Sequence, residues 1–251
     1  MNNIFTIVPV FNEKETFYRL IAEIKDILPE GKIVVIDDGS DPPVRLIKRS
    51  NLYLIRHEEN KGYGAALMSG INFARKEKAE IIITIDADGQ HFPKRIPEFL
   101  GKIENYDIVS GSRYHPLSIK LSEPPYERKV INKVITQILR ELTGYNITDS
   151  FCGYRCYKSY VFDEFYPYDK GYGFPLELWA HFKKFNYKYS EIPVELYYPI
   201  KKNFSSELKD SEKRLKYYLG LIEKSFKVSI KRKGLKLFRE FMKNMEEGIY
   251  G

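Results

Sequence analysis

The sequence predicts an α/β protein with a mostly parallel sheet flanked by helices. Short runs of apolar and β-branched residues alternate with helical patterns over the first 112 residues, and acidic clusters follow two of these runs. Such alternation is typical of βαβ units, which place parallel strands in one sheet through right-handed crossovers. A chain of 251 residues can bury one sizeable core.

The predicted sheet comes from the first half of the chain. Strands are expected at five apolar runs, which are 4–10, 33–36, 52–55, 80–85 and 108–109. Helices are expected where apolar residues recur every three or four positions, at 17–28, 65–76 and 96–103. The acidic clusters directly follow the second and fourth strands. In open α/β sheets ligands bind outside the carboxyl ends of the strands, so these clusters are expected on one rim.

The second half is less regular and ends in a basic tail. The expected elements are two helices, a strand and a helical tail, at 126–142, 174–185, 187–198 and from 208 onward. This pattern predicts a domain at 1–205 and an amphipathic tail at 206–251. Residues 200–251 carry 14 Lys and Arg against 7 Asp and Glu, which accounts for the whole net charge of +7. Such a tail suits an anionic membrane surface, packing on the domain or packing on a partner protomer, and the sequence leaves these open.

Composition also bears on the cellular setting. Met1 leads almost directly into a strand pattern, and no apolar run reaches roughly 18 residues, so neither a signal peptide nor a transmembrane helix is expected. Cys152 and Cys156 are too few for a disulfide framework or a four-ligand zinc site. We therefore expect a cytoplasmic protein whose only membrane contact is peripheral, on the cytoplasmic face.

The segment Asp86-Ala87-Asp88 places two carboxylates directly after the fourth predicted strand. In extended backbone, residues two apart point to the same side, so both carboxylates can share one hard cation. The expected ion is Mg²⁺ or Mn²⁺ bound to a diphosphate, because such ions take few protein ligands and complete their shell with phosphate and water oxygens. Gln90 and His91 follow as further candidate ligands.

Two further clusters suit a nucleotide. The segment Asp37-Asp38-Gly39-Ser40 can be a plain turn, or its carboxylates can accept hydrogen bonds from a base or a ribose. Residues 60–66 open a predicted helix with small side chains, which lets a ligand approach the backbone at the anion-favouring start of the helix. Neither cluster alone decides between these interpretations.

Five motifs occur together in one order: PVFNE at 9–13, VIDDGS at 35–40, NKGYGAA at 60–66, DADGQHFP at 86–93 and GSRY at 111–114. With that spacing the chain resembles the family-2 glycosyltransferases of the GT-A (Rossmann-like) fold, most closely the dolichyl-phosphate or polyprenyl-phosphate mannose and glucose synthases. The resemblance covers about residues 3–200. It implies a GT-A fold, a nucleotide-sugar donor, and Mg²⁺ or Mn²⁺ as cofactor.

The resemblance also implies roles for individual residues. Nucleotide-sugar binding is implied for Pro9, Phe11, Glu13, Ile36, Asp38, Asp86, Ala87 and Arg113. A catalytic role is implied for Asp88, Arg113 and Asp149, and metal binding for Asp86, Asp88 and Gln90. Acceptor-phosphate binding is implied for Arg128 and Arg155, and Lys201 and Lys202 are the candidates to replace the phosphate-binding charge where the chain departs from the family pattern. The chain departs from the family pattern at Phe11, where Tyr is usual, at Cys152, where Ser is usual, and after residue 198, where a Gly-x-Ser-Lys stretch is missing.

The implied reaction moves a hexose, with inversion, from GDP-mannose or UDP-glucose to a dolichyl or polyprenyl phosphate. A phosphate monoester is already ionised at neutral pH and needs no general base, whereas a hydroxyl acceptor needs one. The first alternative is therefore a glycosyltransferase of the same fold that acts on a sugar hydroxyl of a polysaccharide or glycoprotein glycan. In that case Asp149 or Glu177 is the candidate base.

Two other functional classes fit less well. A nucleotidyltransferase shares the acidic metal site but needs a Gly-rich, basic segment after the first strand, where this chain has Phe11-Asn12-Glu13. A nucleic-acid-binding module needs a basic groove, and residues 1–199 carry 27 basic and 27 acidic residues. No nucleic-acid partner is expected.

Overall fold

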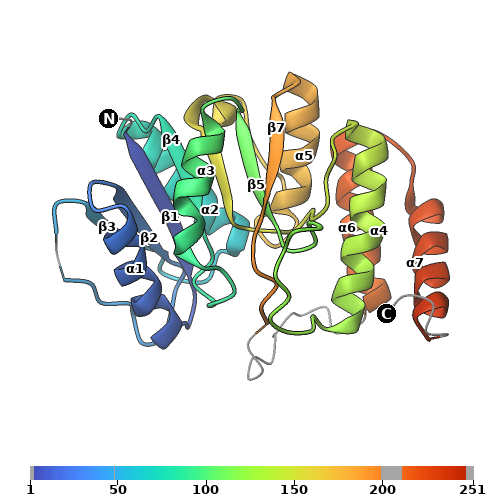
Figure 1. Cartoon of the computed structure of the whole chain (residues 1–251), viewed down its shortest axis with the longest axis horizontal. Coiled ribbons are helices and arrows are strands. Elements are labelled where there is room, and N and C mark those ends of the chain that lie inside the picture. Colours follow the sequence, from blue (N-terminus) through green and yellow to red (C-terminus); the bar gives the residue numbers. More distant parts are fainter. Residues whose placement is uncertain (1–2, 48, 199–210, 247–251) are drawn as a thin grey trace.

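The computed structural model describes residues 3–47, 49–198 and 211–246 (Figure 1). Lys201 and Lys202, two of the predicted phosphate ligands, lie outside the described residues. The described chain forms a seven-stranded sheet in the order β3-β2-β1-β4-β6-β5-β7. Its strands are β1 (Ile4–Val10), β2 (Lys32–Asp37), β3 (Leu52–Arg56), β4 (Ile81–Thr84), β5 (Ile108–Ser112), β6 (Arg155–Lys158) and β7 (Tyr189–Pro193).

The mostly parallel sheet predicted from the sequence is confirmed, with one antiparallel strand inside it. β6 lies between β4 and β5 and runs against both, with Arg155 opposite Thr84 on one side and Ser110 on the other. This strand was not predicted, because Arg-Cys-Tyr-Lys forms no apolar run and is buried only through its neighbours. The other strands remain parallel, so β1, β2, β4 and β5 all end at the same edge.

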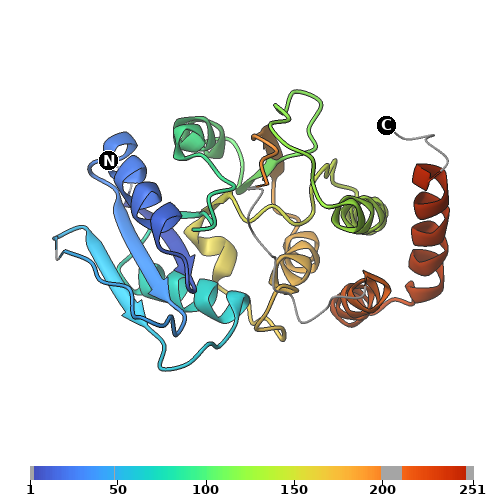
Figure 2. The same ribbon diagram turned by 90° about the horizontal axis from the view of Figure 1, so that it is seen from below.

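Helices cover both faces of the sheet (Figures 1 and 2). They are α1 (Glu15–Ile27), α2 (Tyr63–Lys76), α3 (Ile96–Ile103), α4 (Tyr126–Thr143), α5 (Phe174–Phe185), α6 (Ser211–Phe226) and α7 (Lys231–Glu246). The apolar sides of α1 and α3 share one hydrophobic cluster with the sheet, and α2, α4 and α5 share the other. These helices lie where apolar periodicity predicted them. In α1, for example, Phe17, Leu20, Ile21 and Ile24 form the buried stripe.

The C-terminal helices use their apolar sides against the rest of the molecule. Leu215, Leu219 and Ile222 of α6 are fully buried in the cluster that also contains α4 and α5. Phe238 of α7 is buried as well, and α7 packs beside α4 and α6 (Figure 1). Of the uses left open for this tail, the structure favours packing on the domain. No described helix combines the length and the apolar character needed to cross a membrane.

Candidate active site

The predicted acidic clusters lie at one edge of the sheet, where the parallel strands end (Figure 1, lower edge). Asp37 is the last residue of β2, Asp86 is the second residue after β4, and Arg113 directly follows β5. β2, β4 and β5 come from distant parts of the sequence, so only the fold brings these groups to one rim. This rim is the candidate active site.

Asp37 stabilises the turn that follows β2. Its carboxylate accepts hydrogen bonds from the backbone N–H of Ser40 at 2.9 Å and of Val44 at 3.0 Å, and it pairs with Arg56. Burial acts to raise the pKa of Asp37, but these donors outweigh burial and the pKa is lowered. Asp37 therefore has a structural role in the turn.

Asp38 joins that turn to the start of α2. Its Oδ1 accepts the backbone N–H of Lys61 and its Oδ2 that of Gly62, each at 2.9 Å, and His57 Nδ1 lies 2.6 Å from Oδ1. Asp38 was predicted to hold the base or ribose. In the structure both of its oxygens accept hydrogen bonds from the protein, so Asp38 fixes the turn after β2 against the start of α2.

The segment after β1 also reaches the rim. Asn12 has a positive φ of 55°, and its backbone N–H donates to Ser40 Oγ at 2.9 Å, which links the end of β1 to the turn after β2. Phe11 is exposed there, and Glu13 accepts a hydrogen bond from Thr16. Among the other predicted nucleotide ligands, Pro9, Ile36 and Ala87 have buried side chains, and Ile36 belongs to a core cluster. Because these three side chains are buried, only the backbone of these residues is available to contact a nucleotide.

Asp86 and Asp88 remain partly exposed at the rim. Tyr63 donates its hydroxyl proton to Asp86 Oδ1 at 2.8 Å, and His91 Nε2 lies 3.5 Å from Asp86 Oδ2. Burial acts to raise the pKa of Asp86, but the contacts with His91 and Tyr63 and the charge of Arg113 outweigh it, so the pKa is lowered. Asp86 is therefore ionised at neutral pH, the form that binds a metal.

Gln90 completes the predicted metal set. Its backbone N–H donates to Asp88 Oδ1 at 3.0 Å and its side-chain amide to Oδ2 at 2.6 Å, so the structure brings Asp88 and Gln90 together. Among the described residues, no group of three or more His, Cys, Asp and Glu side chains forms a ready metal cage. Mg²⁺ and Mn²⁺ need none when a diphosphate supplies further oxygens, so the carboxylates of Asp86 and Asp88 fit such an ion.

Gly153 lets Asp86 occupy its position. A Cβ atom on Gly153 would lie 2.3 Å from Asp86 Oδ2 and 2.6 Å from the Tyr63 hydroxyl oxygen, closer than any real contact. The backbone that follows Cys152 thus forms one wall of the carboxylate site. Glycine is needed here because of close approach, and not because of a turn.

Arg113 and Asp149 form a buried ion pair beside this wall. Arg113 Nε lies 2.7 Å from Asp149 Oδ2, Nη2 lies 3.1 Å from Oδ1, and Asn132 donates to Oδ1 at 2.7 Å. Burial acts to raise the pKa of Asp149, but the charge and hydrogen bonds of Arg113 lower it to about 2. Burial acts to lower the pKa of Arg113, but the charge of Asp149 outweighs burial, so this pKa is raised. The structure thus joins two of the three predicted catalytic residues in one pair.

The other predicted phosphate ligands separate into two groups. Arg128 is half-buried at the start of α4. Burial lowers the pKa of Arg128, the charge of Arg214 lowers it further, and the interaction with Tyr198 acts to raise it. Arg113 Nη1 donates to the hydroxyl of the same Tyr198 at 3.3 Å. Arg113 and Arg128 thus lie near one tyrosine, with Arg214 of α6 near Arg128.

Arg155 takes a different position from the one predicted. It is fully buried in β6, where Nε donates to Ser110 Oγ at 3.2 Å and Nη2 to the Ser150 carbonyl at 3.0 Å. Its guanidinium carbon lies 4.9 Å from the centre of the Trp179 ring. The side chain of Arg155 is part of the core, so in this structure it presents no surface to an acceptor.

Two tyrosines at the rim were missed by the sequence analysis. Tyr63 hydrogen-bonds Asp86, and Tyr172 stacks on Tyr63 with ring centres 5.7 Å apart. Although Tyr172 is 61% exposed, burial of its phenol raises the pKa, and the charges of Asp86, Asp88 and Asp38 act in the same direction. The only local signal was a tyrosine between two glycines, Gly171 and Gly173, just before a predicted helix.

Glu177 and Asp169 hold the loop that carries Tyr172. Glu177 accepts the backbone N–H groups of Tyr168 at 2.7 Å and Asp169 at 2.6 Å, and burial raises its pKa. Asp169 Oδ2 in turn accepts the backbone N–H groups of Gly171 at 2.9 Å and Gly173 at 2.8 Å. Tyr217 of α6 donates its hydroxyl proton to Asp169 Oδ1. This hydrogen bond connects α6 to the loop that carries Tyr172.

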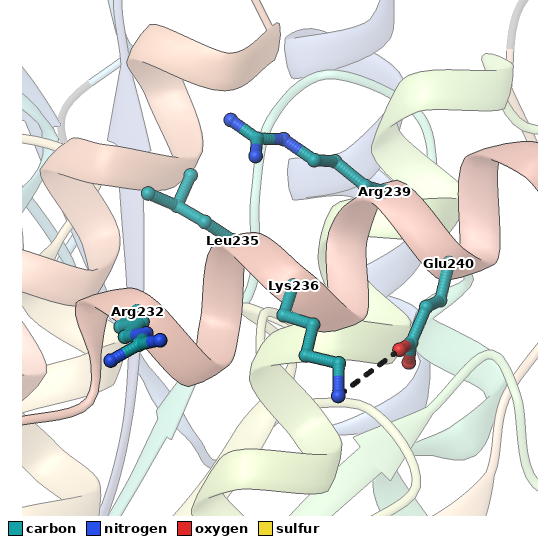
Figure 3. A pocket seen from close by; sticks show the side chains of 5 residues that line it. All are labelled: Arg232, Leu235, Lys236, Arg239 and Glu240. Carbon is teal, nitrogen blue, oxygen red and sulfur yellow. Dashed lines mark ion pairs between the residues drawn. The ribbon is translucent and has the colours of Figure 1, made fainter.

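A hollow lies on α7, away from this rim (Figure 3). It encloses about 380 Å³ and is lined by Arg232, Leu235, Lys236, Arg239 and Glu240, all from one helix. Lys236 and Glu240 form an ion pair of 3.8 Å across it. Side chains from a single exposed helix enclose no ligand, so the rim remains the better candidate site.

Comparison with known proteins agrees with this geometry. The chain is 27% identical over 203 residues to an undecaprenyl-phosphate mannosyltransferase of Micrococcus luteus, covering 76% of this chain and 82% of that protein. It is 31% identical over 175 residues to a UDP-N-acetylglucosamine–dolichyl-phosphate N-acetylglucosaminyltransferase of Methanococcus voltae, covering 61% and 68% of the two chains.

A solved structure has the same fold. Glucosyl-3-phosphoglycerate synthase from Mycobacterium tuberculosis, in complex with Mn²⁺, UDP and phosphoglyceric acid, superposes with a TM-score of 0.64 over 91% of this chain and 80% of that chain, at 17% identity. Residues 6–165 match the sequence profile of the family described as glycosyl transferase family 2. The profile covers more than half of the chain, includes the carboxylates at the ends of β2 and β4, and extends through β6. This chain is therefore a glycosyltransferase that belongs to glycosyl transferase family 2.

Proposed function

We propose that this glycosyltransferase moves a hexose, with inversion, from GDP-mannose or UDP-glucose to a polyprenyl phosphate. The observation that carries the choice of acceptor is the state of the two candidate bases. Asp149 is paired with Arg113 and has a pKa of about 2, which makes it a very weak base. Both oxygens of Glu177 accept backbone N–H groups of a loop. An ionised phosphate acceptor needs neither residue as a base.

In the proposed reaction, a phosphate oxygen of the acceptor attacks the anomeric carbon of the donor sugar. The bond between that carbon and the diphosphate oxygen breaks, and the nucleoside diphosphate leaves with the bonding electron pair. Asp86, Asp88 and Gln90 would hold Mg²⁺ or Mn²⁺, which when bound supplies positive charge for the leaving diphosphate. No proton has to move from the acceptor, so the protein's task is to orient two anions and neutralise them.

Arg113 and Arg128 would supply the charge for the acceptor side. A guanidinium binds phosphate through parallel hydrogen bonds and stays charged even when it is half-buried. Asp149 would then act by holding the Arg113 guanidinium in place, through the 2.7 Å and 3.1 Å contacts described above. Tyr172, stacked on Tyr63 beside the carboxylates, is placed to cover the sugar.

Three similarities support this proposal. The Micrococcus luteus relative is named for an undecaprenyl-phosphate acceptor, and the Methanococcus voltae relative for a dolichyl-phosphate acceptor. The Mycobacterium tuberculosis structure, which is similar in fold alone, contains UDP and Mn²⁺. A location on the cytoplasmic face of a membrane is part of the same proposal.

The decisive experiment offers a panel of nucleotide sugars, with Mg²⁺ or Mn²⁺, to the purified chain together with a polyprenyl phosphate. Metal-dependent transfer to the lipid phosphate by the wild type, lost in Asp88→Ala, would support the proposal and identify the sugar. Donor binding without transfer to the phosphate, but with transfer to a sugar hydroxyl, would replace the lipid acceptor by a glycan. Binding of no nucleotide sugar would refute the proposed donor.

A further inference from the structure

The loop between β5 and α4 exposes aliphatic side chains although its backbone is fixed. Leu117 is 75% exposed, Ile119 53% and Leu121 52%. The backbone N–H of Leu121 donates to the Leu196 carbonyl at 2.9 Å, and that of Leu196 donates to the Ile119 carbonyl at 2.9 Å. These bonds hold the apolar side chains out of the core. Residues 117–121 form the part of this connection with the exposed aliphatic side chains, the 117–121 loop.

The 117–121 loop is connected directly to the proposed phosphate site. Ser122 Oγ, just beyond the loop, accepts the backbone N–H of Tyr198 at 2.6 Å. The hydroxyl of Tyr198 accepts a hydrogen bond from Arg113 Nη1 at 3.3 Å, and Arg128 lies near the same tyrosine. One tyrosine therefore lies between the exposed apolar loop and the arginines that would bind a phosphate.

The surroundings of the loop suit the headgroup layer of a bilayer. Lys120 is exposed between Ile119 and Leu121 and pairs with Glu123, two residues beyond the loop. Alternating positions in an extended segment point to opposite sides, so Ile119 and Leu121 share one side and Lys120 takes the other. The loop extends from the carboxyl-end edge of the sheet in Figure 1 and projects from the body of the molecule in Figure 2. Apolar tips beside a cation are typical of segments that bind at a membrane interface.

We propose that the 117–121 loop inserts Leu117, Ile119 and Leu121 into the lipid bilayer, so that the arginines at the rim meet the phosphate of a bilayer-embedded acceptor. This inference deepens the proposed function and rests on it for the identity of the acceptor. The phosphate of a prenyl lipid lies at headgroup level while its chain stays among the acyl chains. An enzyme that binds this phosphate at Arg113 and Arg128 must bring the neighbouring surface to the same depth, and that surface is the 117–121 loop.

This inference assigns the membrane contact to a loop rather than to the amphipathic tail. The apolar residues Leu215, Leu219 and Ile222 of α6, and Phe238 of α7, are already buried against the domain. Side chains that are buried in the core cannot enter a bilayer without unfolding the helix. The exposed aliphatic side chains of the 117–121 loop can enter it with no change in the fold.

The first test places a fluorophore on the loop. The only tryptophan in the sequence, Trp179, is fully buried, so an added tryptophan reports on its own surroundings. We expect the emission of Leu117→Trp to shift to shorter wavelength on adding phosphatidylcholine vesicles that contain phosphatidylglycerol. Ile47→Trp is the matched control, because Ile47 is an aliphatic residue 81% exposed between β2 and β3. Equal emission changes in both variants, or none in Leu117→Trp, would overturn the inference.

The second test removes the apolar tips. A variant that combines Leu117→Ser, Ile119→Ser and Leu121→Ser should keep its melting temperature and sediment with the vesicles at least about tenfold less than the wild type. Ile47→Ser should sediment like the wild type. If size-exclusion chromatography shows a wild-type dimer that the triple variant breaks, the loop covers a second copy of the chain and the inference is wrong.

Two acceptors separate this inference from the proposed function. The triple variant should transfer sugar normally to a short, water-soluble prenyl phosphate, and at least about tenfold more slowly to a long prenyl phosphate embedded in vesicles. Equal rates for wild type and variant on the embedded acceptor would overturn the inference. If the wild type uses neither phosphate while Leu117→Trp still responds to vesicles, the proposed acceptor is wrong and the membrane surface stands.

Discussion

The two sides of the candidate active site contain carboxylates in different environments. On the side built by β1, β2 and β4, Asp86 and Asp88 are partly exposed. Tyr63 and His91 contact Asp86, and the side-chain amide of Gln90 donates to Asp88. On the side built by β5, β6 and α4, Asp149 is fully buried and paired with Arg113. A partly exposed carboxylate can bind a cation that arrives with its ligand. A carboxylate already neutralised by an arginine positions that arginine instead.

The sharpest test of this difference is the same substitution on each side. Asp149→Asn leaves the Arg113 guanidinium buried without its counter-charge, which should lower the free energy of unfolding by about 3–5 kcal/mol. Asp88→Asn changes a partly exposed group and should alter that free energy by no more than about 0.5 kcal/mol, while it abolishes metal-dependent transfer. Chemical denaturation of both variants gives the comparison. Equal stability of the two would show that Asp149 is not the structural partner of Arg113.

Acid should reveal the same buried pair. The pKa of Asp149 is about 2 in the folded chain, below the value of about 3.9 for an unfolded aspartate. A lowered pKa stabilises the fold above the unfolded value, and this stabilisation is lost as the pH falls from about 4 through 2. The loss amounts to about 2–3 kcal/mol. Denaturation at stepwise lower pH should show this loss in the wild type and a shallower one in Asp149→Asn. Parallel curves would contradict the assignment.

On the side of Asp86 and Asp88, we expect a displaced carboxylate to lower the activity more than the stability. Gly153→Ala would place a methyl group 2.3 Å from Asp86 Oδ2 and displace that carboxylate. We expect kcat/KM to fall about tenfold, or about 1.4 kcal/mol of transition-state stabilisation, with a weaker apparent affinity for the metal. Gly101→Ala is the control, because its Cβ has no neighbour within 4 Å. If both variants keep wild-type activity, Gly153 does not shape the carboxylate site.

The smallest expected effect concerns the connection between α6 and the Tyr172 loop. Tyr217→Phe removes the hydroxyl that donates to Asp169 and should cost about 1 kcal/mol of stability. If the loop covers the donor, KM for the nucleotide sugar should rise about threefold, with kcat unchanged. Tyr166→Phe, at an exposed tyrosine of the same loop, should change neither the stability nor the KM for the nucleotide sugar. A fall in kcat alone would mean that the loop acts on the chemical step.

The acidic side of the rim was predictable because its signals are local in sequence. Asp86 and Asp88 follow a fully buried strand, and strand ends can be recognised from apolar runs that stop at turn residues. The expectation that Asp37, Asp38, Asp86 and Asp88 reach one edge needed only the rule for parallel sheets. What could not be predicted was the different use of the neighbours Asp37 and Asp38, since both are buried by contacts with residues about twenty positions away.

The basic side was harder to predict because its contacts are distant in sequence. The pairing of Arg113 with Asp149 joins residues 36 positions apart, and Tyr198 is 85 positions from Arg113. The position of Arg155 depends on β6, whose sequence does not resemble a strand. Tyr172 and Tyr217 lie in a loop and a helix whose contact with the rim is a property of the packed structure. Propensity and periodicity contain no information about such contacts.

The inserted antiparallel strand has a consequence for synthesis of the chain. β4 and β5 have β6 as their common neighbour, so neither completes its pairing until residues 155–158 have left the ribosome. The nascent chain can form β1, β2, β3 and β4 as a parallel unit, but the outer edge of β4 then stays open. Open strand edges pair with other chains. We therefore expect a fragment that stops short of β6 to aggregate, whereas one that extends beyond β7 can complete the seven-stranded sheet.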